Sequence, residues 1–123
     1  MLTGIHSVVI WTEDVSRLLP FYRDVLGLKP QMENKGFVAF EASSGAALAL
    51  GSHSEVKGRS RDPYRMMVDL QVDDCQTEYE RLSKQGVEFI RTPTKDAIHI
   101  IATFHDPDGN VLQLLEDREG SLA

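Results

Sequence analysis

The chain has 123 residues, of which 41% are hydrophobic and 26% are charged. These proportions are ordinary for one globular domain and exclude a disordered, collagenous or coiled-coil chain. The formal net charge of −6 disfavours binding to nucleic acid or to an anionic membrane surface, because both need positive charge. The lone cysteine, Cys75, excludes an intrachain disulfide and a multi-cysteine zinc site.

The sequence also bears on where the protein works. Its first residues lack the basic start and the apolar run of a signal peptide. Its apolar stretches are only a few residues long, which is too short for a membrane-spanning helix. A single thiol fits a reducing compartment. We therefore expect a cytoplasmic protein that does not bind membranes.

The first part of the chain predicts one helix among four strands. Residues 5–11 are rich in β-branched side chains and predict a strand. Asp14 is a candidate helix N-cap, and apolar residues recur at helical spacing over 15–26. Pro20 has no N–H to donate within that helix, so we expect a kink or a loose first turn. The turn residues that follow separate three expected strands, over 29–33, 37–42 and 46–51.

The same order of elements then recurs. A polar stretch, residues 52–65, reads as a linker or a long loop. Residues 66–72 predict a strand, and Asp74 is a candidate N-cap for a helix that ends at Gly86. The remaining strands are expected over 87–91, 98–104 and 111–116, with a strong turn at Asp106-Pro107-Asp108-Gly109-Asn110.

The order βαβββ therefore occurs twice, with Asp14 of the first copy matching Asp74 of the second. We predict an α+β fold made of two βαβββ modules. The predicted organisation is a single domain, 1–123, with a first module over 4–51, a linker over 52–65, a second module over 66–117 and a tail over 118–123. One copy alone would expose an apolar sheet face, so the copies must pack.

Four stretches carry a resemblance to a known family. They are Gly4-Ile5-His6, Asp14-Val15, Phe21-Tyr22-Arg23-Asp24-Val25-Leu26-Gly27-Leu28, and the turn 106–110 leading into Leu112-Gln113-Leu114-Leu115-Glu116. The start of the second helix, Val72-Asp73-Asp74, also fits. In these the chain resembles the vicinal oxygen chelate superfamily, the glyoxalase, bleomycin-resistance and extradiol-dioxygenase group. The resemblance implies curved mixed sheets around a cavity and a homodimer. It implies no one activity, because the fold hosts isomerases, dioxygenases, thiol transferases and metal-free drug binders.

The resemblance also implies where a metal would bind. In enzymes of the family, His, Glu or Gln side chains on the first and fourth strands of each module hold a divalent ion. The matching positions here are Ser7, Ala49, Met67 and Gln113. They lack the imidazoles and carboxylates that offset the lost hydration of such an ion. We expect no metal and no cofactor. The alternatives are a slipped register of the first strand that brings in His6, or a site that combines His99 or His105 with Asp69 or Glu116.

Several polar groups outside that set have simpler structural interpretations. We expect His6 to be half-buried and hydrogen-bonded to backbone, and His53 to be solvated in the linker. Asp73 and Asp74 stand at a helix start, which favours capping over acid–base catalysis. Cys75 lies on the apolar stripe of its helix, which favours a buried, unreactive thiol over a catalytic one.

Strand alternation selects the side chains that would line the implied cavity. The predicted pocket residues are Ser7, Val9, Trp11, Ala49, Met67, Asp69 and Gln113. Apolar area with a few hydrogen-bonding groups is typical of a small-molecule pocket, and the small residues at 47, 49 and 51 would leave room. A buried Asp69 would favour a cationic or hydrogen-bond-donating ligand. Four linker residues could meet an anionic group, although a solvated basic loop is favoured: Lys57, Arg59, Arg61 and Arg65.

We therefore predict a metal-free homodimer that binds a small molecule, either a drug or a metabolite. Two alternatives remain at this point. One is a metal-dependent glyoxalase-like lyase, isomerase or dioxygenase with a shifted ligand set. The other is an interaction module whose pocket is vestigial. The sequence names no catalytic residue and does not decide whether the protein is an enzyme.

Overall fold

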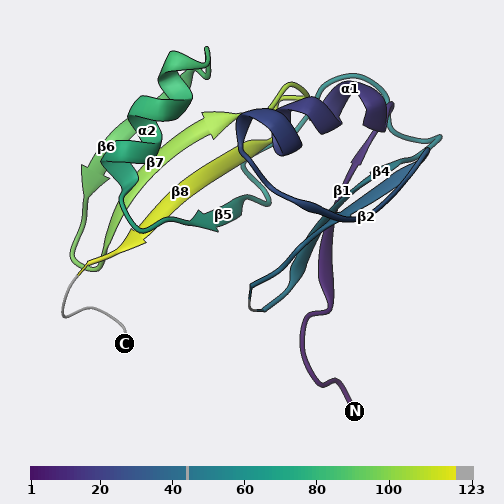
Figure 1. Ribbon diagram of the computed structural model, residues 1–123, viewed down its shortest axis with the longest axis horizontal. Coiled ribbons are helices and arrows are strands. Elements are labelled where there is room, and N and C mark those ends of the chain that lie inside the picture. The colour runs from purple at the N-terminus through teal and green to yellow at the C-terminus, as the bar shows by residue number, and fades with distance from the viewer. Residues whose placement is uncertain (44, 119–123) are drawn as a thin grey trace. The chain divides into compact units, whose positions relative to one another are not determined.

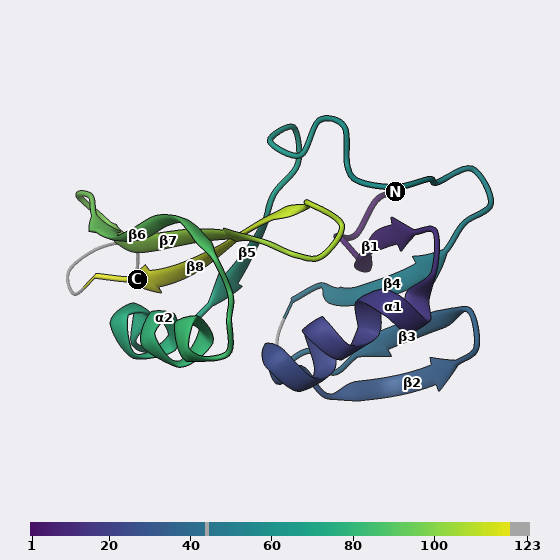
Figure 2. The same ribbon diagram turned by 90° about the horizontal axis from the view of Figure 1, so that it is seen from above.

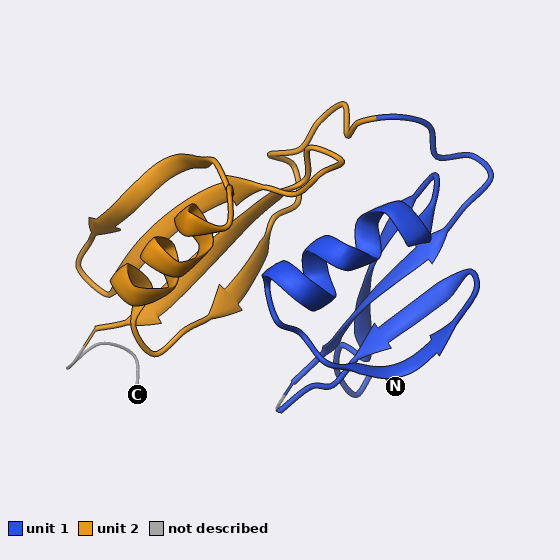
Figure 3. Ribbon diagram, turned by 45° about the horizontal axis from the view of Figure 1, so that its top comes forward, with its two compact units in different colours: residues 1–58 blue, residues 59–123 orange. Residues whose placement is uncertain are grey.

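The computed structural model describes residues 1–43 and 45–118. The chain divides into two compact units, residues 1–58 and 59–123 (Figure 3). Within the described residues, each unit contains one four-stranded sheet with helical structure packed against it (Figure 1). No helix in these ranges is long and apolar enough to cross a membrane.

Unit 1 has one helical segment and four strands. Its elements are β1 (Ser7–Thr12), α1 (Val15–Pro20), η1 (Phe21–Val25), β2 (Pro30–Asn34), β3 (Phe37–Phe40) and β4 (Ala47–Ser52). The strand order is β1-β4-β3-β2, with β1 parallel to β4 and the other neighbours antiparallel. Helix α1 packs on β3 and β4 (Figure 2).

Unit 2 repeats this topology. Its elements are β5 (Val68–Gln71), α2 (Cys75–Lys84), β6 (Phe89–Lys95), β7 (His99–His105) and β8 (Val111–Asp117). The strand order is β5-β8-β7-β6, and β5 runs parallel to β8. The predicted α+β fold with two βαβββ modules is therefore confirmed, because the element order and the pairing are the same in both units.

Pro20 changes the hydrogen bonding of the first helix. The α-helix ends at Pro20, and the next five residues, Phe21–Val25, form a π-helical turn. In that turn the Leu26 N–H donates to the Phe21 carbonyl over 2.9 Å. A proline cannot donate within the α-helical ladder, so the pattern changes where it stands. The expected irregularity thus takes the form of a π turn after Pro20.

Strand β6 begins and ends later than the sequence predicted. Gly86 closes α2 with a φ of +91°, a left-handed conformation that glycine adopts without strain. The Val87 N–H then donates to the Leu82 carbonyl over 3.1 Å, which holds Val87 against the helix end. The strand therefore starts at Phe89 and not at Val87.

Each sheet buries one face against its helix. In unit 1 the Tyr22 and Phe40 rings stack with centroids 6.4 Å apart, and Val38 and Leu50 are fully buried beside them. In unit 2 the Tyr79 ring meets Phe89, with centroids 4.7 Å apart. Because side chains alternate along a strand, the residues between these core positions lie on the face opposite the helix.

Both helices begin at the aspartates that the sequence predicted as caps. Asp14 Oδ1 accepts from the Ser16 N–H over 3.0 Å, and Asp74 Oδ1 accepts from the Thr77 N–H over 3.0 Å. The Ser16 hydroxyl also donates to Asp14, and these hydrogen bonds lower the pKa of that carboxyl. The capping role expected of Asp74 is confirmed.

The last strand of each unit supplies a second cap, which the sequence did not predict. The Val15 N–H donates to Ser52 Oγ over 3.0 Å, and the Cys75 N–H donates to Glu116 Oε1 over 2.7 Å. Ser52 ends β4, and Glu116 occupies the corresponding position near the end of β8. The two units therefore tie the first free backbone donor of their helices to the neighbouring parallel strand in the same way.

Candidate functional site

Four of the seven predicted pocket residues share one face of the unit 1 sheet. Val9 pairs with Ala49 in the parallel β1–β4 register, so their side chains lie on the same side. Ser7 and Trp11 stand two positions before and after Val9 and therefore share that side. Leu50 faces the helix and is fully buried. The structure thus places Ser7, Val9, Trp11 and Ala49 together opposite α1.

The indole of Trp11 covers part of this face. Trp11 pairs with Gly51, and a β-carbon on Gly51 would lie 2.3 Å from Trp11 Cζ3. The Phe37 ring flanks the indole, with centroids 6.2 Å apart. Trp11 is nevertheless 44% exposed. The room predicted at position 51 is therefore occupied by the tryptophan itself, which presents a flat apolar surface.

His53 is exposed, as expected for a residue of the linker, and it also contacts this group. Its backbone N–H donates to the Thr12 carbonyl over 3.0 Å, which extends the strand pairing by one residue. Its ring meets the Trp11 indole edge-on, with centroids 5.5 Å apart. Glu55 donates its N–H to His53 Nδ1 over 3.1 Å, so the neutral ring carries its proton on Nε2. We call Trp11, Phe37 and His53 the aromatic cluster.

Two further predicted residues meet on the sheet of unit 2. Asp69 pairs with Gln113 in the parallel β5–β8 register, and Gln113 pairs with Thr103 in the antiparallel β7–β8 register. Gln113 Nε2 donates to Asp69 Oδ1 over 2.9 Å, and the Thr103 hydroxyl donates to Gln113 Oε1 over 3.1 Å. We call these three side chains the polar row. It lies opposite α2, because the neighbouring Phe104 packs on the helix side.

Met67, the seventh predicted residue, is not part of either group. It precedes β5 and is 43% exposed. Thr103 is the residue of the polar row that the sequence analysis missed, and a signal for it existed. The predicted turn over 106–110 sets the register of the β7–β8 hairpin, and that register places Thr103 opposite Gln113.

The residues at the family's metal positions do not fit a hard divalent cation. Ala49 has no donor atom, and Met67 offers a soft thioether. The Gln113 carbonyl oxygen, the atom a metal would require, already accepts from Thr103. Within residues 1–43 and 45–118, no three His, Cys, Asp or Glu side chains are grouped so as to hold a metal.

Of the histidines considered for an unorthodox metal site, His99 and His105 lie on β7 and share the strand face of Thr103, whereas His6 lies in unit 1. His6 is exposed, and its Nδ1 lies 3.1 Å from Ser7 Oγ, so the expected half-buried contact with backbone is wrong. Glu116 caps α2 on the helix side of the sheet, whereas Asp69 lies opposite that helix. Glu116 and Asp69 therefore lie on opposite faces of the sheet and could not bind one metal ion together.

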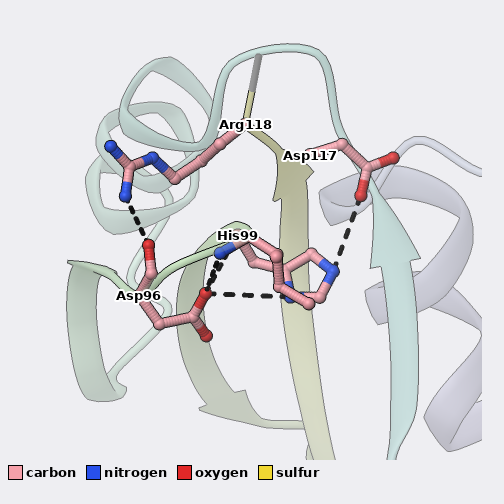
Figure 4. Close-up of polar contacts among 5 residues, drawn as sticks. Asp96, His99, Asp117 and Arg118 are labelled. Carbon is pink, nitrogen blue, oxygen red and sulfur yellow. Dashed lines mark hydrogen bonds and ion pairs between the residues drawn. The ribbon is translucent and has the colours of Figure 1, made fainter. Parts of the chain in front are cut away.

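His99 lies between two carboxylates at one end of β7 (Figure 4). Its Nε2 is 3.6 Å from Asp117 Oδ1 and its Nδ1 is 4.0 Å from Asp96 Oδ1. Asp96 Oδ1 also accepts the backbone N–H groups of Ile98 and His99, and these bonds lower the pKa of Asp96. Arg118 donates to the Asp96 carbonyl in the same cluster. The group closes the β6–β7 turn onto the end of β8.

Two of the basic linker residues make local contacts within unit 2. Arg59 lies against the 106–110 turn, with Nη1 3.5 Å from the Pro107 carbonyl oxygen. A β-carbon on Gly109 would lie 2.8 Å from Arg59 Nη2, so the turn admits the guanidinium only because glycine stands there. Arg65 pairs with Asp62 over 3.0 Å. These contacts are structural, in line with the favoured interpretation of the basic loop.

A surface hollow on unit 1 lies away from the predicted residues. It is lined by Gly27, Leu28, Lys29, Gln31, Glu41, Ala42 and Ser43. None of the seven predicted pocket residues contributes to it. Its walls are the loop after η1 and the ends of β2 and β3, so it belongs to the sheet edge and not to the face opposite α1.

The paired βαβββ units, each with one sheet face opposite its helix, define a glyoxalase-like α+β fold. The profile of the Glyoxalase/Bleomycin resistance protein/Dioxygenase superfamily matches residues 4–114, and the chain belongs to that superfamily. It shares 44% identity over 45 residues with the uncharacterized protein YurT of Bacillus subtilis (strain 168). That match spans 37% of this chain and 35% of YurT.

Solved structures share the fold over nearly the whole chain. A glyoxalase/bleomycin resistance protein/dioxygenase from Nocardioides is 25% identical, with a TM-score of 0.74 over 98% of this chain and 87% of that one. A superfamily member from Sphaerobacter thermophilus is 25% identical, with a TM-score of 0.73 over 94% and 98%. TnmS3, an antibiotic-binding protein from Streptomyces sp. CB03234, is 20% identical, with a TM-score of 0.77 over 95% and 98%.

Proposed function

We propose that this protein binds a small molecule without a metal, using the sheet face of unit 1 that carries the aromatic cluster. The observation that carries the proposal is Trp11, whose six-membered ring lies over Gly51 while the residue stays 44% exposed. An exposed tryptophan held by neighbouring rings offers a planar aromatic compound a stacking surface at little entropic cost. The proposed ligand is therefore a drug or metabolite with a planar aromatic part.

The position of His53 supports this proposal. Its backbone is held on Thr12, and its ring edge contacts the indole, so Trp11 is restrained before any ligand arrives. The Gly58 N–H donates to Glu13 Oε1 over 3.0 Å, which anchors the same segment a second time. A binding surface that is already ordered loses less entropy on binding than a mobile one.

The donor set at the family's metal positions supports the metal-free part of the proposal. Ser7, Ala49, Met67 and Gln113 supply no carboxylate and no imidazole. The antibiotic-binding protein TnmS3, with the same fold, is a precedent for binding within this architecture. We further propose that the protein acts as a cytoplasmic homodimer without a cofactor, as expected from its sequence.

A thermal-shift screen with paired metal analysis tests the proposal. Untagged protein would be stripped with EDTA and screened against naphthalene, quinoline and acridine derivatives, with elemental analysis of a sample equilibrated with Zn²⁺, Ni²⁺, Mn²⁺ and Fe²⁺. A ligand at ten times its Kd adds about 1.4 kcal/mol of stability, which raises the Tm by a few degrees. We expect such shifts in EDTA. Retention of about one metal per chain, or no shift with any compound, would overturn the proposal.

Two variants distinguish binding at the aromatic cluster from nonspecific binding to exposed aromatic residues. Trp11→Leu removes the proposed stacking surface and should abolish the ligand-induced rise in Tm. Tyr64→Leu is the matched control, because Tyr64 is also an exposed aromatic residue, at 60%, but lies in the segment before β5. It should leave the rise unchanged. An equal loss in both variants would contradict the assignment of the site to Trp11.

A further inference from the structure

We infer that the aromatic part of the ligand carries a neutral hydrogen-bond acceptor, a ring nitrogen or a carbonyl oxygen, and that the Nε2–H group of His53 donates to it. The inference rests on the proposed function and adds the chemical class of the ligand to it. It concerns unit 1 alone. It makes His53 a residue that determines specificity, in addition to its contact with Trp11.

The loop itself fixes the tautomer of the neutral His53 ring. The Glu55 N–H donates to His53 Nδ1 over 3.1 Å, and a ring nitrogen that accepts a hydrogen bond carries no proton. The opposite tautomer would set two protons against each other, because a backbone N–H can only donate. The proton is therefore on Nε2, and the loop presents His53 as a hydrogen-bond donor at that atom.

This donor has no protein acceptor within residues 1–43 and 45–118. The side-chain hydrogen bond of His53 in these ranges is the one that Nδ1 accepts. Because the residue is exposed, water takes the Nε2 proton in the free protein. An acceptor on the ligand can replace that water and keep the hydrogen bond. A ligand without an acceptor would cover the donor and leave it unsatisfied.

The angle between the two rings lets the donor reach a compound on the indole. The imidazole of His53 is inclined by 74° to the Trp11 indole, with centroids 5.5 Å apart. An aromatic compound stacked on the indole lies parallel to it, at about 3.5–4 Å. The lone pair of a ring nitrogen or a carbonyl lies in the plane of that compound, and the imidazole plane crosses this plane steeply. The indole N–H of Trp11 stays in the indole plane and points past a stacked compound.

The backbone keeps this donor in one place. The His53 N–H donates to the Thr12 carbonyl over 3.0 Å, and Gly58 is tied to Glu13 on the same segment. A donor in a fixed position distinguishes ligands that differ at a single atom, because a misplaced acceptor loses its water without gaining a partner. The neutral ring adds no charge to the aromatic cluster, so a neutral acceptor is the chemistry that matches it.

Three uncharged probes of one shape test this inference. Full-length protein, stripped with EDTA, would be titrated calorimetrically at pH 8 with naphthalen-2-ylmethanol, quinolin-3-ylmethanol and quinolin-6-ylmethanol. The two quinolines place the nitrogen in one ring or in the other. A neutral hydrogen bond predicts that at least one quinoline binds about two- to tenfold more tightly than the naphthalene. Binding of both quinolines no tighter than the naphthalene would overturn the inference.

Three variants locate the effect at His53. His53→Phe keeps a flat ring beside Trp11 and removes the donor, so the preference for the quinoline should disappear or reverse. His53→Gln supplies an amide N–H at similar reach and should restore part of the preference. His6→Phe removes another exposed histidine of unit 1 and should keep the wild-type preference. If His53 only supported Trp11, His53→Phe would weaken the three probes by one factor and keep the preference.

The tautomer can be measured directly. In protein labelled with ¹⁵N-histidine, the nitrogen shifts of His53 at pH 8 should be those of the Nε2–H form, assigned from the signals that His53→Phe lacks. Binding of the preferred quinoline should move the Nε2 proton downfield and slow its exchange with water. The Nδ1–H form in the free protein, or an Nε2 proton that no quinoline perturbs, would contradict the inference.

The outcomes separate this inference from the proposed function. If the naphthalene binds as tightly as both quinolines, or if His53→Phe keeps the preference, the inference is wrong while small-molecule binding stands. If the three probes do not bind but the aromatic panel gives thermal shifts, shifts no larger for its quinolines than for its naphthalenes overturn the inference. If the panel also gives no shift, the proposed function fails and the inference fails with it. His53 is exposed, so its variants should fold normally.

Discussion

The six-membered ring of Trp11 lies directly over Gly51 of the neighbouring parallel strand, where a β-carbon would be only 2.3 Å from Cζ3. A single hydrogen at position 51 therefore decides where the chain's one tryptophan lies. Trp11 is nevertheless 44% exposed, so part of its surface stays available to a ligand. The close packing of Trp11 on Gly51 therefore also positions the proposed binding surface.

Adding one methyl group at position 51 should displace the indole. Gly51→Ala places a β-carbon within 2.3 Å of Cζ3 and 2.6 Å of Cε3 of Trp11, so the ring must move. We expect a red-shifted tryptophan emission and a loss of about 1–3 kcal/mol in the free energy of unfolding. Gly36→Ala is the control, because a β-carbon there meets nothing within 4 Å. Unchanged emission in Gly51→Ala would contradict the placement of the ring.

The caps supplied by the last strands should contribute measurably to stability. Glu116→Ala removes the acceptor of the Cys75 N–H, and Ser52→Ala removes that of the Val15 N–H. Each should lower the free energy of unfolding by about 0.5–2 kcal/mol in urea titrations. Glu116→Gln keeps an acceptor oxygen and should cost less than the alanine change. Glu88→Ala, an exposed change on the same unit, should have little effect.

The Cys75 thiol should be unreactive in the native protein. It is fully buried, and burial raises its pKa, with the carboxylates of Glu116 and Asp74 adding to the effect. Native protein should react with Ellman's reagent roughly 1,000-fold or more slowly than urea-unfolded protein, since attack requires opening. Because the folded pKa is raised above the unfolded value, stability should fall as pH rises past that value. Fast native labelling would contradict this burial.

The Asp96 cluster should make stability depend on acid pH (Figure 4). The folded-state pKa of Asp96 is lowered, so its stabilisation is complete above the unfolded value of 3.8 and disappears as pH falls through the folded value. Asp96→Asn should be less stable than wild type at pH 7, and the gap should close on acidification. Urea titrations across that range measure it.

The order of elements and the location of the two helices could be read from the sequence because they follow from local signals. The caps at Asp14 and Asp74 and the closing Gly86 act within a few residues of where they stand. Alternation along β1 likewise placed Ser7, Val9 and Trp11 on one face. The register of β7 against β8 could also have been predicted from the sequence, because a short turn joins the two strands.

The hydrogen bonds and ring contacts of the two candidate surfaces depend on pairing between distant parts of the chain. Asp69 meets Gln113 because β5 runs parallel to β8, and parallel strands are joined by long connections that set no register locally. His53 meets Trp11 because its backbone continues the pairing with β1 beyond the end of β4. Nothing near His53 in the sequence indicates a partner so far back along the chain.

The residue types alone establish that a hard metal ion has a poor donor set at the family positions, since donor chemistry does not depend on folding. They also establish the superfamily, because its motifs are local strings of residues. Tertiary structure decides which polar groups form hydrogen bonds with one another and which remain available to a ligand. That outcome depends on strand register, because a shift of the register by one residue would move every side chain of a strand to the other face. The contact of Thr103 with Gln113 is one that depends on it.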